Sequence, residues 1–164
     1  MKKYILLLCV AIFLVNSSIA QEKKKSKKEI KLEKKKSKFE ASKKAMEIGQ
    51  FGFAIRKIVS SNIKVSDFAA GILYVRGNEG ELDEIVWYKA IGERIRLFKD
   101  FDIKNYNVIA SDKEQTMTAT YQGLVNNVRY SFTTVISYDK KPKLKIKSED
   151  GIEIWYTGVF DTRN

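Results

Sequence analysis

The longest regular alternation in the chain is Val128–Tyr138, which reads VRYSFTTVISY. Its even-numbered positions are aromatic, aliphatic or threonine, and most of the positions between them are polar. Successive side chains of a β-strand point to opposite faces of the sheet, so this period of two predicts a half-buried strand. The stretch therefore makes a β-rich fold the first expectation.

The same alternation recurs on both sides of this stretch. Short, turn-rich links join the runs of the C-terminal half, and Asp150-Gly151 is the strongest hairpin signal among them. Strands joined by short links must run antiparallel, because parallel neighbours need a long crossover. The C-terminal half is therefore predicted as an antiparallel meander of four or five strands. The other alternating runs are Phe51–Val59, Ile85–Ile91, Tyr106–Ala110, Met117–Tyr121, Leu144–Ile146 and Ile152–Phe160.

Residues 60–99 are less regular than the rest of the predicted sheet. Gly71–Arg76 has the pattern of a short strand, and Gly77–Gly80 has the composition of a turn. Ala90–Lys99 fits either a strand or a helical turn. The sequence therefore leaves the middle of the domain open.

A helix is predicted before the strands. Phe39, Ser42 and Met46 repeat at the spacing of one helical face, which predicts a packed helix over Lys38–Ile48 with Gly49 as its stop. The predicted fold class is α+β, mainly β: an N-terminal helix and then an antiparallel meander of about six to eight strands. The pattern leaves open whether the helix covers one face of the sheet or the sheet curls into a partial barrel.

The first twenty residues follow the three-part plan of a secretory signal peptide. A basic start, Met1–Tyr4, precedes the uncharged run Ile5–Val15, and the small residues Ser18 and Ala20 suit a signal peptidase. The run is shorter than the roughly 20 apolar residues of a membrane span, although an uncleaved anchor is the alternative. We therefore expect cleavage after Ala20, export to the periplasm or cell envelope, and no transmembrane span after processing.

Two residue types that carry much enzyme chemistry are scarce. The 164-residue chain has no His, and its one Cys, Cys9, lies inside the predicted leader. These counts exclude His-based triads and, after cleavage, disulfides, thiol nucleophiles and Cys/His zinc sites. No G-x-S-x-G, P-loop or dinucleotide-binding motif is present. The sequence predicts no catalytic residue, no metal site and no cofactor.

The carboxylate pairs do not change this prediction. Asp83-Glu84 would point to opposite faces of a strand, and Glu149-Asp150 lie in a predicted turn, where Asp serves the backbone. Asp100 and Asp102 share one side of an extended segment, but lysines flank them. No calcium-loop pattern accompanies any of these acids.

The net charge of +11 is concentrated near the N-terminus. Residues 21–44 contain twelve Lys and four Glu, a net of +8, whereas residues 45–164 carry a net of only +1. The basic segment is either a solvated spacer or a contact with an anionic envelope surface, where each lysine gains roughly 1 kcal/mol. Nucleic acid is not expected, because no aromatic residue interleaves with the lysines to stack a base. The lysines expected at an anionic surface are Lys23, Lys24, Lys25, Lys27, Lys28, Lys34, Lys35 and Lys36.

The chain is predicted to have three parts. Gln21–Lys38 is low in complexity, and two large apolar residues, Ile30 and Leu32, cannot offset the entropy of ordering it. We therefore expect a signal peptide at 1–20, a basic tether or fluctuating helix at 21–38, and a single β-rich domain at 39–164.

The aromatic residues are the remaining signal for a binding site. Most alternate with Ile, Val and Phe and are predicted to fill the core. The pairs Trp87-Tyr88 and Trp155-Tyr156 are adjacent on predicted strands, so the two rings of each pair face opposite sides. We therefore expect a member of each pair to line an outer groove or cavity, which makes Trp87, Tyr88, Trp155 and Tyr156 the candidate ligand-binding residues.

Three features occur in a fixed order along the chain: a leader with a Lys/Glu-rich helix, the aromatic strand start Gln50–Phe53, and the terminal strand Ile154–Gly158 of the form Ile-x-Tyr-x-Gly. This order resembles a family of small exported bacterial proteins known only as a domain of unknown function, over Phe39–Phe160. Members carry a Leu-Pro-Tyr motif in the middle, whereas Ile72–Tyr74 here lacks the proline. The resemblance implies export and one β-rich domain, and it brings no catalytic residue.

These observations favour an exported, non-enzymatic binding or structural module of the cell envelope, whose partner the sequence does not identify. One alternative is a small carboxylate- or Tyr-dependent hydrolase or lyase, which requires a deep pocket with two acids within about 5–10 Å of each other. Another is an accessory subunit that adds a strand to a partner's sheet, which requires an exposed sheet edge.

Overall fold

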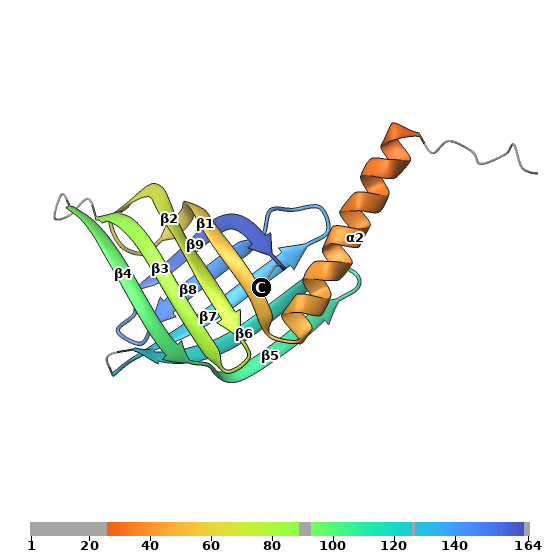
Figure 1. The fold of residues 1–164 in the computed structure, drawn as a ribbon. Coiled ribbons are helices and arrows are strands. Elements are labelled where there is room, and N and C mark those ends of the chain that lie inside the picture. The colour runs from red at the N-terminus through yellow and green to blue at the C-terminus, as the bar shows by residue number, and fades with distance from the viewer. Residues whose placement is uncertain (1–25, 89–92, 126, 163–164) are drawn as a thin grey trace, which may run out of the picture. The chain divides into compact units, whose positions relative to one another are not determined.

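The computed structural model describes residues 26–88, 93–125 and 127–162 (Figure 1). Within these residues a helix precedes nine strands, and consecutive strands follow one another with short connections. The elements are α2 (Lys27–Glu47), β1 (Gln50–Ser61), β2 (Val65–Arg76), β3 (Glu79–Tyr88), β4 (Glu93–Asp102), β5 (Lys104–Ser111), β6 (Thr116–Val125), β7 (Val128–Ser137), β8 (Lys143–Ser148) and β9 (Glu153–Asp161).

The nine strands form one antiparallel sheet in the order β4-β3-β2-β1-β9-β8-β7-β6-β5. The sheet curls until it nearly closes as a barrel, and its two edge strands, β4 and β5, are consecutive in the chain (Figure 1). The predicted fold class is confirmed, because an N-terminal helix precedes a mainly antiparallel β domain. Asp150-Gly151 forms the hairpin turn between β8 and β9, as expected.

The sheet contains one strand more than the predicted six to eight. The added strand is β4, in the segment that fitted either a strand or a helical turn. Its pairing with β3 runs unbroken from Glu79 opposite Asp102 to Tyr88 opposite Glu93. The hydrogen bonds of this ladder decide the conformation, and local periodicity does not reveal them. β2 is also longer than predicted, beginning at Val65.

The helix begins at Lys27 and so extends further toward the N-terminus than predicted. A capping box explains this start: the Glu29 amide donates to Ser26 Oγ at 3.2 Å, and the Ser26 amide donates to Glu29 Oε2 at 2.7 Å. Gly49, with a φ of 66°, follows the helix and its amide donates to the Met46 carbonyl, as expected of a stop. The chain divides into two compact units, residues 1–34 and 35–164, and α2 contributes to both.

The interior of the curled sheet is filled by aromatic rings in mutual contact. The centroid of Phe132 lies 4.8 Å from that of Phe101 and 5.2 Å from that of Tyr121, with nearly parallel planes. Tyr121 also stacks on Tyr106 at 5.7 Å and meets Phe51 edge-on at 6.4 Å. We call these five residues the ring stack. They come from five different strands, so the stack joins strands that are distant in the sheet order.

Phe101, on the edge strand β4, packs across the gap of the curled sheet. Its ring covers Gly80 of the neighbouring strand β3 and Gly123 of β6, where an added Cβ would overlap ring atoms. Because both positions lack a side chain, the ring lies flat against the backbone and reaches Phe132 on β7. The β4 edge is thus held to β6 and β7 by packing.

The C-terminal part of α2 packs on the sheet through the face that was predicted to be apolar. Ser42 and Met46 are buried, and Phe39 meets the ring of Tyr138 edge-on at 5.8 Å between centroids. The hydroxyl of Tyr106 donates a hydrogen bond to the carbonyl oxygen of Met46 in the last turn. This bond links the end of the helix to the edge strand β5.

Substitution of Gly123 tests the role of Phe101 in closing the sheet. Gly123→Ala should lower the free energy of unfolding by about 1–3 kcal/mol, since the new methyl must displace the Phe101 ring. The control is Gly52→Ala, whose Cβ would lie 3.4 Å from the Tyr74 ring and should cost less than about 1 kcal/mol. Urea unfolding of both variants measures the difference, and equal values would show that the ring is not confined.

A pH titration of stability tests the Tyr106 contact. Burial raises the pKa of Tyr106 from its ordinary value of 10.0 to about 12. The folded state therefore holds this proton more tightly than the unfolded state, and its stabilising contribution is complete below pH 10 and lost as the pH rises toward 12. Tyr106→Phe should be less stable than the wild type at pH 7, by about 1 kcal/mol for the lost hydrogen bond.

The stability difference between the wild type and Tyr106→Phe should shrink between pH 10 and pH 12. Urea unfolding at a series of pH values gives this difference directly, and the titration of the other tyrosines and lysines is common to both proteins. A constant difference across this range would contradict the assigned pKa.

Candidate functional site

The interior of the curled sheet has no polar group left over for a ligand. Among the described residues, every buried side-chain nitrogen or oxygen has a hydrogen-bond partner. Thr134, for example, is fully buried and its hydroxyl lies 3.4 Å from the hydroxyl of Tyr121. The rings of the stack lie in mutual contact between the strands. The candidate sites are therefore depressions on the outside of the sheet.

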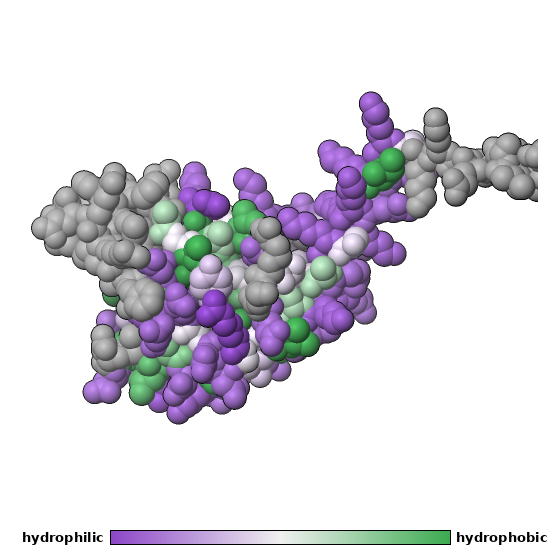
Figure 2. Space-filling view, viewed as in Figure 1, coloured by the Kyte–Doolittle hydropathy of each residue, from purple (hydrophilic) through white to green (hydrophobic). Residues whose placement is uncertain are grey.

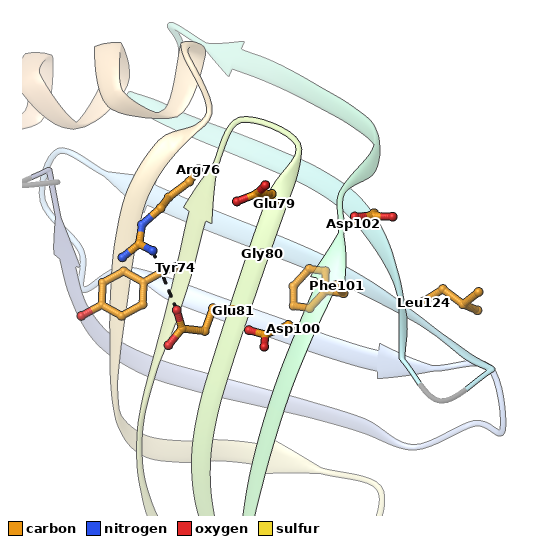
Figure 3. A pocket seen from close by; sticks show the side chains of 9 residues that line it. All are labelled: Tyr74, Arg76, Glu79, Gly80, Glu81, Asp100, Phe101, Asp102 and Leu124. Atoms are coloured by element: carbon orange, nitrogen blue, oxygen red, sulfur yellow. Dashed lines mark ion pairs between the residues drawn. The ribbon is translucent and has the colours of Figure 1, made fainter.

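The first depression has a volume of about 400 Å³ and lies at one end of β2, β3 and β4 (Figure 3). Glu81 is directly opposite Asp100 in the β3–β4 ladder, and Glu79 is opposite Asp102. We call these four carboxylates and the depression they line the acidic pocket. Figure 3 shows their side chains around Phe101, whose own ring belongs to the buried core. Alternation along both strands thus gathers the four acids on the outer face.

One cation lines the acidic pocket. Nη1 of Arg76 lies 3.8 Å from Oε2 of Glu81, and the guanidinium carbon lies 4.9 Å from the ring centroid of Tyr74. Glu79, Asp100 and Asp102 are exposed to solvent. Water therefore screens these carboxylates, and none has the dry surroundings that convert a carboxyl group into a general acid.

Metal binding finds no support in the part of the chain that the structure describes. No group of three or more Asp, Glu, His or Cys side chains there has the arrangement of a metal site. The pocket is consequently an acidic surface with one ion pair.

The two tyrosines of the ring stack hold their protons more tightly than free tyrosine does. Burial raises the pKa of Tyr106 to about 12. Burial also raises the pKa of Tyr121, while its hydrogen bond with Thr134 acts in the opposite direction. Both phenols are therefore protonated at neutral pH. The four acids of the pocket lie on the outer face of β3 and β4, whereas Tyr106 and Tyr121 belong to the ring stack.

The second depression has a volume of about 470 Å³ and surrounds Trp155 on the outer face of β9 and β1. Trp155 is half-buried and points outward, whereas the neighbouring Tyr156 is 1% exposed and belongs to the core. The alternation of β9 explains this division between the two adjacent rings. The residues that line this depression, which we call the Trp155 groove, are Ser60, Ser61, Asn62, Lys147, Gly151, Glu153 and Trp155.

Polar contacts fix the indole of Trp155 and give the groove a positive side. Nε1 of Trp155 donates to Oε1 of Glu153 at 3.1 Å. Lys145 is directly opposite Trp155 in the β8–β9 ladder, and its Nζ lies 5.1 Å from the ring centroid. Lys143 and Lys147 precede and follow it on the same face of β8, so alternate residues place ammonium groups roughly 7 Å apart along the strand.

Asn62 shapes one end of the Trp155 groove. Its Nδ2 donates to the carbonyl oxygen of Gly151 at 2.6 Å, and its Oδ1 accepts from the amide of Glu153 at 2.7 Å. The Asn62 amide also donates to the carbonyl oxygen of Glu153 at 3.1 Å. Three hydrogen bonds therefore hold the end of β1 against the start of β9, next to the indole of Trp155.

The structure separates the two predicted aromatic pairs. Trp87 and Tyr88 are on β3, and Trp155 and Tyr156 are on β9, with β2 and β1 between them in the sheet order. The side chains of Trp87 and Tyr88 lie outside the described residues; their backbones pair with β4, and that of Tyr88 also pairs with Val65 of β2. The ligand-binding role of all four residues stays a prediction.

The predicted basic contact residues lie partly on α2. Lys23, Lys24 and Lys25 lie outside the described residues. The surface of α2 is mostly hydrophilic, with a small hydrophobic spot near its N-terminal end (Figure 2). The described members of the predicted set are all exposed: Lys27, Lys28, Lys34, Lys35 and Lys36.

The described residues include one helix, α2. No helix there combines the length and the apolar character needed to cross a bilayer.

Sequence reasoning missed most residues of both depressions. Glu79 and Glu81 face Asp100 and Asp102 only through the β3–β4 ladder, and β4 was not assigned from the pattern. Asn62 reaches the groove through a contact with residues far along the chain. The polar run Ser60-Ser61-Asn62 at the end of the first strand is a turn signal, but it does not indicate which strand Asn62 will contact.

The fold has a solved counterpart. It is similar to the 1.95 Å crystal structure of a DUF4251 family protein from Bacteroides eggerthii DSM 20697, with a TM-score of 0.58 and 9% sequence identity. The likeness covers 74% of this chain and 85% of that chain. Comparison of the sequence with protein-family models gives no match, and comparison with curated proteins gives none. At this identity the likeness shows the fold alone, and it agrees with the expected resemblance to a domain of unknown function.

Substitution of Asn62 tests the structure of the groove. Asn62→Ala should lower the free energy of unfolding by about 1 kcal/mol, since two side-chain hydrogen bonds are lost at a site that water reaches. Asn62→Asp keeps the acceptor for the Glu153 amide but loses the donor to Gly151, so an intermediate loss is expected. Urea unfolding ranks the wild type and the two variants. Wild-type stability in both variants would argue against a stabilising role of the Asn62 hydrogen bonds.

Proposed function

We propose that the protein is an exported, non-catalytic binding module of the cell envelope that holds its partner on the outer surface of the curled sheet. The ring stack carries this proposal, because within the side chains that the structure describes it occupies the kind of interior space that small ligand-binding barrels leave open. Binding must then use side chains that point outward. The Trp155 groove gathers an aromatic ring, hydroxyl groups and a lysine on that outer surface.

The proposed export rests on the sequence of residues 1–20. Their basic start, uncharged run and small residues at the expected cleavage point support processing after Ala20. The Cys9 thiol would be removed with the leader, so the remaining chain would have no thiol to oxidise in an envelope compartment.

The proposed attachment to the envelope rests on the lysines of residues 21–44. Those described on α2 are exposed, except Lys43, which is half-buried and pairs with Glu40 at 3.7 Å. Clustered lysines near anionic lipid gain roughly 1 kcal/mol each, and salt screens the attraction beyond about a Debye length. The segment would act as an electrostatic contact that leaves the outer face of the sheet available.

A role as a strand-donating subunit is supported less well. β5 is an edge strand, and its outward Ile109 is 60% exposed. However, the β5–β6 register shifts between Lys104 and Asn107, and Asn105 has a φ of 56°. Such irregularities twist an edge away from regular pairing and are a common protection of edge strands.

Cell fractionation tests both parts of the proposed function. The full chain with a C-terminal epitope should be recovered from the envelope fraction with Gln21 as its first residue. Replacing Lys23, Lys24, Lys25 and Lys27 by Gln should release the protein from envelopes at a lower NaCl concentration, because four attractive charges are lost.

The matched control removes four exposed lysines from the β domain. Lys104, Lys113, Lys140 and Lys141 replaced by Gln should leave the release concentration unchanged, although the net charge falls by the same amount. Equal release of both variants would show that only overall charge matters. Recovery of the uncleaved chain from the cytosol would overturn the proposed function.

A further inference from the structure

We infer that the Trp155 groove binds an acidic glycan, with one sugar ring against the indole and a carboxylate of the chain on Lys145 and Lys147. This inference rests on the proposed function and names the ligand class of the same outer face. A pyranose ring has apolar C–H faces and a polar rim, so it needs an aromatic face together with hydrogen-bonding groups. The Trp155 groove offers both within about 470 Å³, which suits one or two sugar residues.

The indole of Trp155 is held in place before any ligand arrives. Its Nε1 donates to Oε1 of Glu153 at 3.1 Å, which fixes the plane of the ring. The three hydrogen bonds of Asn62 hold the adjoining chain. An aromatic platform fixed in this way loses little conformational entropy on binding, which favours recognition by a small contact area.

The charge beside the indole selects an anion. Lys147 lines the groove, and Lys145 places its ammonium group 5.1 Å from the indole centroid. Glu153 also lines the groove, opposite Lys147 in the β8–β9 ladder, and it keeps its negative charge while it accepts from Trp155 Nε1. Lys145 and Lys147 together therefore leave one positive charge in excess beside the indole. A carboxylate attached to a sugar on the indole would therefore reach an ammonium group and would form a charge-assisted hydrogen bond.

The geometry favours a glycan over a membrane or a nucleic acid. Trp155 is half-buried in a depression among small polar residues, whereas a ring that enters a bilayer must protrude. Single-stranded nucleic acid is held by several aromatic rings that stack successive bases, and Trp155 is the one aromatic residue that lines this groove. A short chain of uronic acids matches both the ring and the charges.

Tryptophan fluorescence locates the binding site. The chain contains two tryptophans, so Trp87→Phe leaves Trp155 as the reporter and Trp155→Phe leaves Trp87. The full chain, purified from the cell fraction that holds it, is titrated with a trisaccharide of galacturonic acid. We expect a saturable change in emission from Trp87→Phe and none from Trp155→Phe. The uncharged galactose trisaccharide should bind at least about tenfold more weakly, since it lacks the carboxylates.

Two lysines of β8 provide a matched pair for the charge contact. Lys143 and Lys147 are both exposed, lie on the same strand and face, and differ in that Lys147 lines the groove. Lys147→Ala should weaken binding of the galacturonic acid trisaccharide about tenfold, and Lys143→Ala by less than about twofold. Near-ultraviolet circular dichroism checks that each variant is folded.

Four results would overturn the inference: no binding of the acidic trisaccharide, equal binding of the neutral one, equal losses in Lys143→Ala and Lys147→Ala, or tighter binding of a thymidine oligonucleotide. Equal losses would indicate diffuse attraction to the basic strand. The proposed function is judged separately, by the cleavage at Gln21 and by the salt release of the envelope-bound chain. If glycan binding fails while those two results are obtained, only the inferred ligand class is overturned.

Discussion

The contact of the Phe101 ring with Gly80 and Gly123 is the constraint on which the rest of the structure depends. The sheet has two free edges, β4 and β5, so its curl depends on packing between β4 and the strands across the gap. Phe101 provides this packing because its ring lies flat over Gly80 and Gly123, which lack side chains, and stacks on Phe132. The closure is made by apolar packing, which is strong when the rings are fully buried.

This closure decides where the protein can bind anything. Because Phe51, Tyr106, Tyr121 and Phe132 continue the stack from Phe101, the interior is a core of rings. The outer faces of the strands then carry the polar chemistry, and they differ from one another. The β3–β4 ladder presents paired carboxylates, whereas alternate residues of β8 are lysines beside Trp155. A domain with almost no net charge thus has two surfaces of opposite sign.

The fold was largely predictable from the sequence, and the candidate site was predictable only in part. The alternation of Val128–Tyr138 and of the neighbouring runs predicted an antiparallel sheet, which the structure confirms. The prediction succeeded because a period of two along the chain is typical of a half-buried strand. The same rule required Trp155 and Tyr156 to face opposite sides, but it did not say which ring faces the core. The sequence left open whether residues 21–38 form a tether or a fluctuating helix, and the capping box of Ser26 and Glu29 begins the helix there. β4 was missed because its pattern fits two conformations until β3 pairs with it.

The sequence by itself determined the class of fold, the absence of imidazole chemistry and the separation of a basic N-terminal segment from a nearly neutral domain. These properties depend on composition and on local periodicity, which need no knowledge of distant contacts. Only the tertiary structure decided the order of the strands, the closure by Phe101 and the meeting of Asn62, Lys147 and Trp155 in one groove. Each of these depends on register between segments far apart in the chain, and register is set by the packing of the whole core.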